Sequence, residues 1–158
     1  MKRLMLAVAL FVGVLFVGPM SFDETGIQFV SEARASAEAK VSVAVIKATK
    51  SGSVDEKSKR FSSVISQVGG YSGFSYVTDL GFNAELGKAV SKDVAGRKLQ
   101  VTVKSMAADK VTTAVTVVDS SGKRHAVTSS TKPGASVVVA ARSADGSSAH
   151  LFIVTVRY

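Results

Sequence analysis

The sequence predicts an α+β domain, in which one helix on the N-terminal side packs on a mostly antiparallel, curled β-sheet or small sandwich of about six to eight strands. Three observations support this fold class. An amphipathic helical stripe lies early in the chain, alternating strand patterns fill the rest, and turn signals separate the strands by roughly 10–14 residues. Cysteine is absent, so the predicted core has to stabilise the domain without disulfides.

The N-terminus has the features of a signal peptide. Lys2 and Arg3 precede an apolar run over residues 4–18, and Pro19 ends that run. A basic start followed by roughly 15 apolar residues is typical of a signal peptide, whereas a membrane-spanning helix needs about 20. We therefore expect an exported protein, located in the periplasm or at the cell surface.

The position of the predicted cleavage is set by Ala35-Ser36-Ala37, a small-x-small pattern. We expect residues 1–37 to be a signal peptide with an extended c-region, and residues 38–158 to be a single β-rich exported domain. The distance between the apolar run and Ala37 leaves two alternatives open. Cleavage could occur earlier, near residues 18–21, or the segment could stay uncut as a tether.

A buried strand and then a helix open the predicted domain. Residues 41–48 are apolar on both faces, which is typical of a strand buried on both sides. Ser53 and Glu56 have the spacing of a capping box, and Gly69-Gly70 provides a stop, so a helix is expected over residues 54–68. Its apolar stripe consists of Phe61, Val64, Ile65 and Val68.

The remainder of the chain reads as strands and turns. Further strands are expected at residues 74–78, 82–89, 98–104, 111–117, 124–130, 137–141 and 151–156. Residues 124–130 are polar and predict an edge strand. Residues 151–156 are apolar on both faces and predict a central strand, placed beside the first one. Turns are expected at residues 107–110, 119–123, 132–134 and 145–146.

The charge of the chain bears on its partners. The formal net charge is +8, and residues 38–158 keep this value because residues 1–37 contain three basic and three acidic side chains. A basic exported domain is suited to a protein or an anionic polymer of the cell envelope, although dispersed charge also serves solubility. We expect no metal and no membrane-spanning segment in the mature domain, and the sequence leaves its oligomeric state open.

Residues with catalytic or metal-binding potential are few. His125 and His150 are the two histidines, and they have neither the HExxH spacing nor a second histidine nearby. No Gly-x-Ser-x-Gly motif is present. The aspartates fall at turns and at the predicted helix start, where negative charge is favoured. The sequence therefore predicts no catalytic residue, no cofactor and no metal site, and thus no enzyme.

Glycines and aromatic residues alternate over residues 69–76, one to three helical turns from a basic cluster. Such a segment is suited to stacking against a sugar polymer, a peptide or a nucleic acid strand. The predicted contact residues are Lys57, Lys59, Arg60, Tyr71, Phe74 and Tyr76. The alternative interpretation is that Phe74 and Tyr76 are core residues of the following strand, and that the glycines end the helix.

The segments VSVAVIKATKSGSVDEKSKRFSSVI and GGYSGFSYVTDLGFNAELGKAV, followed by a β-rich tail, give the chain a recognisable layout. It resembles small uncharacterised exported α+β domains of Gram-negative, myxobacterium-like cell envelopes. This resemblance implies an envelope or extracellular location and no enzyme activity. It carries over no site residue.

The leading functional hypothesis is a non-enzymatic exported domain that binds a partner or takes part in an envelope assembly, through its edge strands and its glycine-aromatic segment. The alternative is a binding module for an anionic polymer, either polysaccharide or nucleic acid. A minor alternative, a small outer-membrane β-barrel, is suggested by the alternating apolar residues 150–158 and their terminal aromatic residue. The capped helix and the charged strands count against that alternative.

Overall fold

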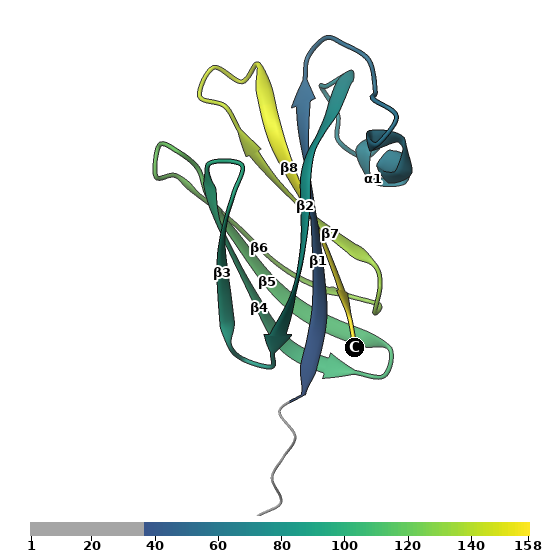
Figure 1. Ribbon diagram of the computed structural model, residues 1–158, viewed down its shortest axis with the longest axis vertical. Helices are drawn as coiled ribbons and strands as arrows, with labels where there is room; N and C mark the ends of the chain where they lie inside the picture. Colours follow the sequence, from purple (N-terminus) through teal and green to yellow (C-terminus); the bar gives the residue numbers. More distant parts are fainter. Residues whose placement is uncertain (1–36) are drawn as a thin grey trace, which may run out of the picture. The chain divides into compact units, whose positions relative to one another are not determined.

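The computed structural model describes residues 37–158, which form two antiparallel sheets of four strands each (Figure 1). Sheet A has the strand order β2-β1-β8-β7, and sheet B has the order β3-β4-β5-β6. The strands are β1 (Glu38–Thr49), β2 (Gly73–Glu85), β3 (Ala89–Val94), β4 (Arg97–Ala107), β5 (Lys110–Val118), β6 (Arg124–Thr131), β7 (Ser136–Arg142) and β8 (Ser148–Arg157). Between β1 and β2 lie the 3₁₀ turn η1 (Ser58–Phe61) and the helix α1 (Ser62–Ile65).

The expected β-rich, mostly antiparallel fold is confirmed. Its eight strands in the described residues form two facing sheets, as in the sandwich form of the prediction. The fold is not clearly α+β as expected, because α1 is a single turn of helix. The predicted signal peptide lies outside the described residues, apart from Ala37.

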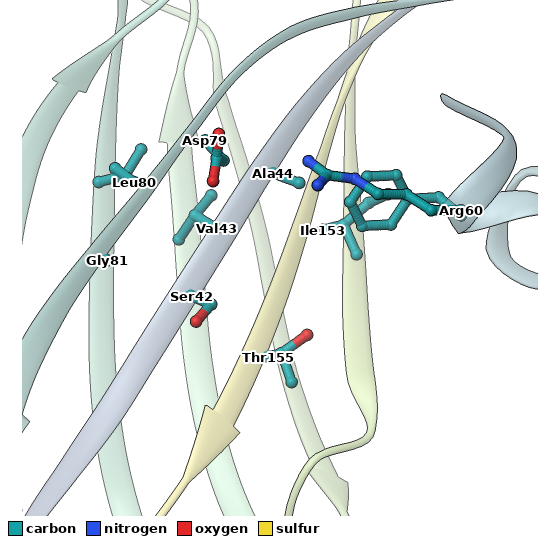
Figure 2. Close-up of a pocket in the computed structure, with 10 residues that line it drawn as sticks. Ser42, Val43, Ala44, Arg60, Asp79, Leu80, Gly81, Ile153 and Thr155 are labelled. Atoms are coloured by element: carbon teal, nitrogen blue, oxygen red, sulfur yellow. The ribbon is translucent and has the colours of Figure 1, made fainter. Parts of the chain in front are cut away.

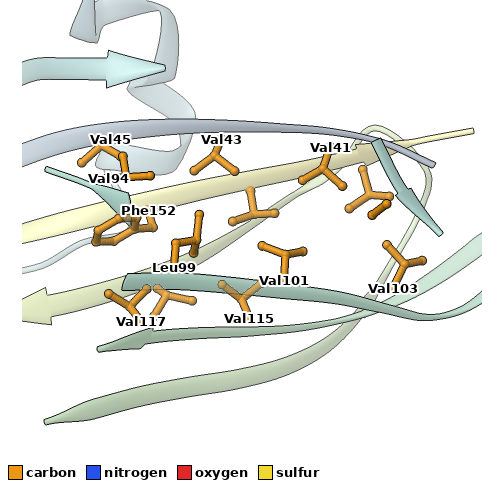
Figure 3. Packing of buried hydrophobic residues seen from close by; sticks show 14 of the residues in the cluster. Val41, Val43, Val45, Val94, Leu99, Val101, Val103, Val115, Val117 and Phe152 are labelled. Atoms are coloured by element: carbon orange, nitrogen blue, oxygen red, sulfur yellow. The ribbon is translucent and has the colours of Figure 1, made fainter. Parts of the chain in front are cut away.

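The two sheets face each other across a core built mainly from valine (Figure 3). Alternate residues of the strands point into this core, as on β4, where Leu99, Val101 and Val103 are buried and Lys98 is exposed. Burying one such side chain contributes about 1.5–3 kcal/mol to stability. The inter-sheet core is therefore the main source of stability in the described domain.

The strands β1 and β8 lie in the centre of sheet A and pair antiparallel, from Lys40 opposite Arg157 to Thr49 opposite Ser148. Next to the helical segment both strands are apolar on both faces, because one face meets sheet B and the other meets that segment. The prediction that the last strand is central and pairs with the first is confirmed. The polar strand β6 lies at the edge of sheet B, as predicted.

A second, smaller core covers part of the outer face of sheet A. Ile65 of α1 is buried there, and Phe61, Val64 and Val68 pack beside it. These four residues are the apolar stripe that the sequence predicts. They rest on buried residues of three strands, namely Ala44, Ile46, Ala48, Phe74, Ala149, Leu151 and Ile153.

The predicted helix over residues 54–68 is wrong in its length and in its cap. The chain stays extended through Val54, which forms a bridge to Phe74, and the Ser53 carbonyl accepts a hydrogen bond from the Phe74 amide. Asp55 provides the cap instead of Ser53, because its Oδ1 accepts a hydrogen bond from the Ser58 amide at 2.6 Å. Pairing with the edge of β2 therefore delays the helix, and turns replace its last part.

The two strands predicted at residues 74–78 and 82–89 are also corrected. Residues 73–85 form one continuous strand, β2, which contains a bulge at Val77. The strand β3 begins at Ala89, where the second predicted strand was expected to end. Pairing with the long strand β1 keeps this whole stretch extended.

Candidate functional site

The ring of Tyr76 on the edge strand β2 lies next to two basic side chains that are among the predicted contact residues. The Lys57 Nζ lies 5.6 Å from the centre of the Tyr76 ring, and the guanidinium carbon of Arg60 lies 4.9 Å from it. Both distances are within the range of cation–π attraction. The Tyr76 amide donates a hydrogen bond of 2.6 Å to Asp55 Oδ2, so the residue that caps η1 also fixes this part of β2.

The bulge at Val77 places a carboxylate next to this ring. In the register of β1 and β2, Ile46 lies opposite Tyr76 and Ala44 lies opposite Asp79. Residues three apart on a regular strand point to opposite faces, but the extra residue brings Tyr76 and Asp79 to the same face. The Tyr76 hydroxyl donates a hydrogen bond to the Asp79 carboxylate, which raises the pKa of Tyr76, while the nearby Arg60 acts in the opposite direction.

A groove of about 400 Å³ opens beside this cluster on the outer face of sheet A (Figure 2). Arg60 reaches over it from η1, and Asp79 lies at its β2 side. Its apolar surface comes from small or branched residues of β1 and β8, and hydroxyls lie farther along the same strands. The lining residues are Ser42, Val43, Ala44, Arg60, Phe61, Asp79, Leu80, Gly81, Ile153 and Thr155.

Gly81 keeps the groove open through its lack of a side chain. A Cβ atom at this position would meet its nearest neighbour, the Val41 carbonyl oxygen, at 3.9 Å, which is ordinary contact. Gly81 is not among the residues with positive φ, so other residues can adopt its backbone conformation. This glycine therefore provides space in the groove, and its backbone freedom is not required.

The polarity of the outer face changes along the strands. Next to the helical segment the face is apolar, and then a row of small polar residues crosses the sheet, in which Ser42 lies opposite both Gly81 and Thr155. One step farther, Lys40 lies opposite Arg157 on the neighbouring strand. The groove is thus bordered by Arg60 on one side and continues toward these two cations on the other.

The segment before η1 covers the start of the free edge of β2. The Phe74 amide donates to the Ser53 carbonyl at 3.0 Å, and the Asp55 amide donates to the Phe74 carbonyl at 2.9 Å. Together with the contact of Asp55 to the Tyr76 amide, these bonds occupy the edge over residues 74–76. A strand added to β2 would have to pair farther along, next to the groove.

The other predicted contact residues lie apart from this groove. Lys59 forms a salt bridge of 2.6 Å with Glu56 on the exposed surface. Phe74 is 4% exposed and belongs to the smaller core, in agreement with the alternative interpretation of this residue. Tyr71 is half-buried and lines a different hollow. The structure therefore brings together Lys57, Arg60 and Tyr76 of the six predicted residues.

Sequence reasoning missed Asp79, Ser42, Gly81 and Thr155. They meet through the pairing of β1 with β2 and β8, and neither this register nor the bulge at Val77 can be read from the sequence. One signal was available, because an isolated glycine inside a strand pattern often marks a special position in a sheet.

The carboxylates with a lowered pKa take part in turns. Hydrogen bonds, chiefly from the Ser121 hydroxyl, lower the pKa of Asp119 to about 2 in the turn between β5 and β6. The Ser143 hydroxyl lowers the pKa of Asp145 in the turn between β7 and β8. Hydrogen bonds from Ser58 and from the Tyr76 amide lower the pKa of Asp55. These shifts are explained by local hydrogen bonding at turns.

The two histidines lie on different sheets. The His125 Nε2 is 3.3 Å from Asp119 Oδ2, and His150 is partly buried on β8 with its pKa lowered to about 4, first by burial and then by Arg97 and Lys47. In residues 37–158, His, Asp and Glu side chains form no group of three or more that could hold a metal ion. In this same range no helix has the length and apolar character needed to cross a membrane.

Comparison with models of protein families, with curated proteins and with solved structures found no match.

Proposed function

We propose that the chain is exported and that its folded domain, residues 38–158, is a non-enzymatic binding domain of the periplasm or cell surface. In this proposal the domain holds a partner protein of the cell envelope in the groove beside Tyr76. The observation that carries the proposal is the groove itself, which combines an apolar surface with the Arg60 guanidinium, the Asp79 carboxylate and two hydroxyls. Concave sites of this composition are typical of ligand binding.

The charges around the groove indicate the chemistry of the partner. Arg60 borders the groove, Lys57 lies over the adjacent ring, and Lys40 and Arg157 lie beyond the row of small polar residues. Asp79 is the one carboxylate in the lining, and the Tyr76 hydroxyl already donates to it. An extended segment that carries apolar and acidic side chains fits this arrangement best. It would lie along β2, past the covered part of its edge.

The expected lack of enzyme activity is supported by the use that the structure makes of its carboxylates. Asp55 caps η1, while Asp119 and Asp145 close turns, and each accepts several hydrogen bonds in that role. Carboxylates with a lowered pKa at turns stabilise the fold. Their perturbed pKa values therefore need no catalytic explanation.

Export is supported by the position of β1 relative to the predicted cleavage point. The strand β1 begins at Glu38, the first residue after the predicted cut. Cleavage there would remove Ala37, whose carbonyl accepts a hydrogen bond from the Leu86 amide. Losing one such hydrogen bond at the end of a sheet costs about 0.5–1.5 kcal/mol. N-terminal sequencing of the exported form should give Glu38 as the first residue.

Site-specific crosslinking tests the binding proposal. A photoreactive residue in place of Ser42, which is exposed within the groove, should crosslink a discrete protein in the cell envelope. The matched control carries the same residue in place of Ser91, which is exposed on β3 of sheet B. Equal crosslinking from both positions, or none from Ser42, would contradict the proposal.

A further inference from the structure

A second hollow, of about 360 Å³, lies at the end of the domain where β4 begins and β7 ends. Three cations line it, and each comes from a different part of the chain: Arg97 starts β4, Lys123 precedes β6, and Arg142 ends β7. The turns at residues 119–121 and 143–144 complete the lining. Both sheets therefore contribute positive charge to one hollow.

The cations in this hollow are not neutralised by the protein. Within residues 37–158, neither Arg97 nor Lys123 nor Arg142 takes part in a salt bridge. Asp119 lines the same hollow, but its carboxylate is already engaged. Its Oδ1 accepts hydrogen bonds from the Ser121 amide, the Ser121 hydroxyl and the Lys123 amide, and its Oδ2 faces His125. The hollow therefore keeps an excess of positive charge.

Arg97 is held in place by the tight turn before it. Ala95 and Gly96 have φ values of 51° and 70°, as in the two central residues of a type I′ hairpin turn. The Arg97 Nη1 donates to the Ala95 carbonyl at 3.2 Å, whereas its buried Nε has no acceptor among the described residues. Buried donors are normally paired. The guanidinium is thus fixed beside the hollow and incompletely satisfied, which favours a bound anion.

Arg142 also lines a neighbouring hollow of about 250 Å³. There it is joined by Lys50 and Tyr71, together with three glycines. The Lys50 amide donates to the Ser147 carbonyl at 3.3 Å, which holds the loop after β1 against the turn between β7 and β8. The two hollows share Arg142, so Lys50, Arg142, Arg97 and Lys123 border one connected surface, which we call the cationic track.

We propose that the cationic track binds a linear acidic polysaccharide, with sulfate or carboxylate groups of the polymer placed at Arg142 and Arg97. The ligand is linear because two adjacent hollows with a shared cation suit successive anionic groups on one chain. A nucleic acid strand fits less well, because single-stranded binding relies on aromatic rings that stack on bases. The lining of the two hollows includes one ring, Tyr71, which packs against the smaller core. This site is separate from the groove and does not depend on the partner proposed there.

The test measures binding of the exported protein to a short heparin oligosaccharide at several salt concentrations. The double variant K123A/R142A removes two exposed cations of the track. The control K104A/K132A removes one exposed cation near the other end of β4 and one from the turn between β6 and β7. The track variant should lose about tenfold or more in affinity, and its salt dependence should become shallower by about two on a log–log plot. The control should bind like the wild type.

A spectroscopic readout locates the ligand independently. Arg97 contributes to the lowered pKa of His150, so an anion bound at Arg97 should raise the pKa of the imidazole, followed by NMR during the binding titration. R97Q should abolish this response. Three results would each overturn the proposal. The pKa of His150 could stay unchanged when the oligosaccharide binds, both double variants could lose affinity equally, or the wild type could fail to bind. A thymidine oligonucleotide of equal charge could bind more tightly than the oligosaccharide and depend on Arg142 in the same way. That result would identify the ligand as a nucleic acid and contradict the proposed polysaccharide.

Discussion

The inner and outer faces of sheet A are built by alternate residues of the same strands, yet they differ in how fully they are covered. On β1, Val41, Val43 and Val45 point inward and are at most 1% exposed, whereas Ser42 between them is exposed. The inner face meets sheet B in one valine-rich core, which on β1 runs from Ala39 to Val45 (Figure 3). The outer face is covered next to the helical segment and opens into the groove beyond it (Figure 2).

Under the proposed function, this difference separates stability from partner binding within a single sheet. A fully apolar face is sealed by a second sheet and leaves no room for a ligand. A face that changes from apolar to polar can be covered in one part and offer a binding surface in the other. We therefore expect substitutions on the inner face to affect mainly folding, and substitutions around the groove to affect mainly binding.

Truncating the inner face should have the largest effect. Phe152 of β8 is fully buried between the sheets, so Phe152→Ala leaves a cavity and should lower the free energy of unfolding by about 3–5 kcal/mol. Denaturant unfolding followed by circular dichroism measures this loss. Thr155→Ala, three residues along the same strand at the groove, serves as the control and should change stability by less than about 1 kcal/mol. Similar losses in the two variants would remove the contrast between the faces.

Truncating the cover of the outer face should have a smaller and more local effect. Ile65 is the buried residue of α1, and Ile65→Ala should lower the free energy of unfolding by about 2 kcal/mol, at the low end for such truncations. Amide hydrogen exchange should then accelerate in residues 58–68, while the amides of β4 and β5 keep their relative protection. Uniform acceleration across both sheets would mean that the two layers unfold as one unit.

Acid should loosen the outer layer through Asp55. Hydrogen bonds from Ser58 and Tyr76 lower its folded-state pKa below the ordinary value of 3.8, so its stabilising contribution is present above that value and is lost as the pH falls below it. Amide exchange in residues 55–68 should therefore increase as the pH falls below 3.8, relative to the inter-sheet core. Asp55→Asn should show the loosened behaviour already at neutral pH, with little further change in acid. A variant that keeps the wild-type pH dependence would assign the effect to other groups.

The inner face of sheet A could be predicted from the sequence more fully than the outer face. The alternation over residues 98–104 predicts the inner core, and the runs at residues 41–48 and 151–156, apolar on both faces, predict the central strands. These features can be predicted because burial directly selects apolar residue types. The apolar stripe from Phe61 to Val68 also packs as predicted. The helix length was wrong because pairing of Val54 with Phe74 overrides the local capping pattern.

The groove could be predicted only in part. Lys57, Arg60 and Tyr76 stand out by their composition, but Asp79 joins them through a bulge, and Ser42 and Thr155 join through the register of three strands. Arg97, Lys123 and Arg142 are far apart in the sequence, so the cationic track appears only once the turns of both sheets are placed. Sites built from cross-strand neighbours depend on long-range pairing, which residue patterns do not specify.

The most direct test of the account is to fill the groove without disturbing the fold. Gly81→Val adds a β-branched side chain at a strand position with free space, so the unfolding midpoint should stay the same or rise slightly. Ser91→Val, at an exposed position of β3 on sheet B, is the matched control. We predict that Gly81→Val abolishes crosslinking of the partner from position 42, while Ser91→Val retains it and both variants remain as stable as the wild type. Undiminished crosslinking in Gly81→Val would contradict the claim that the outer-face groove is the binding site.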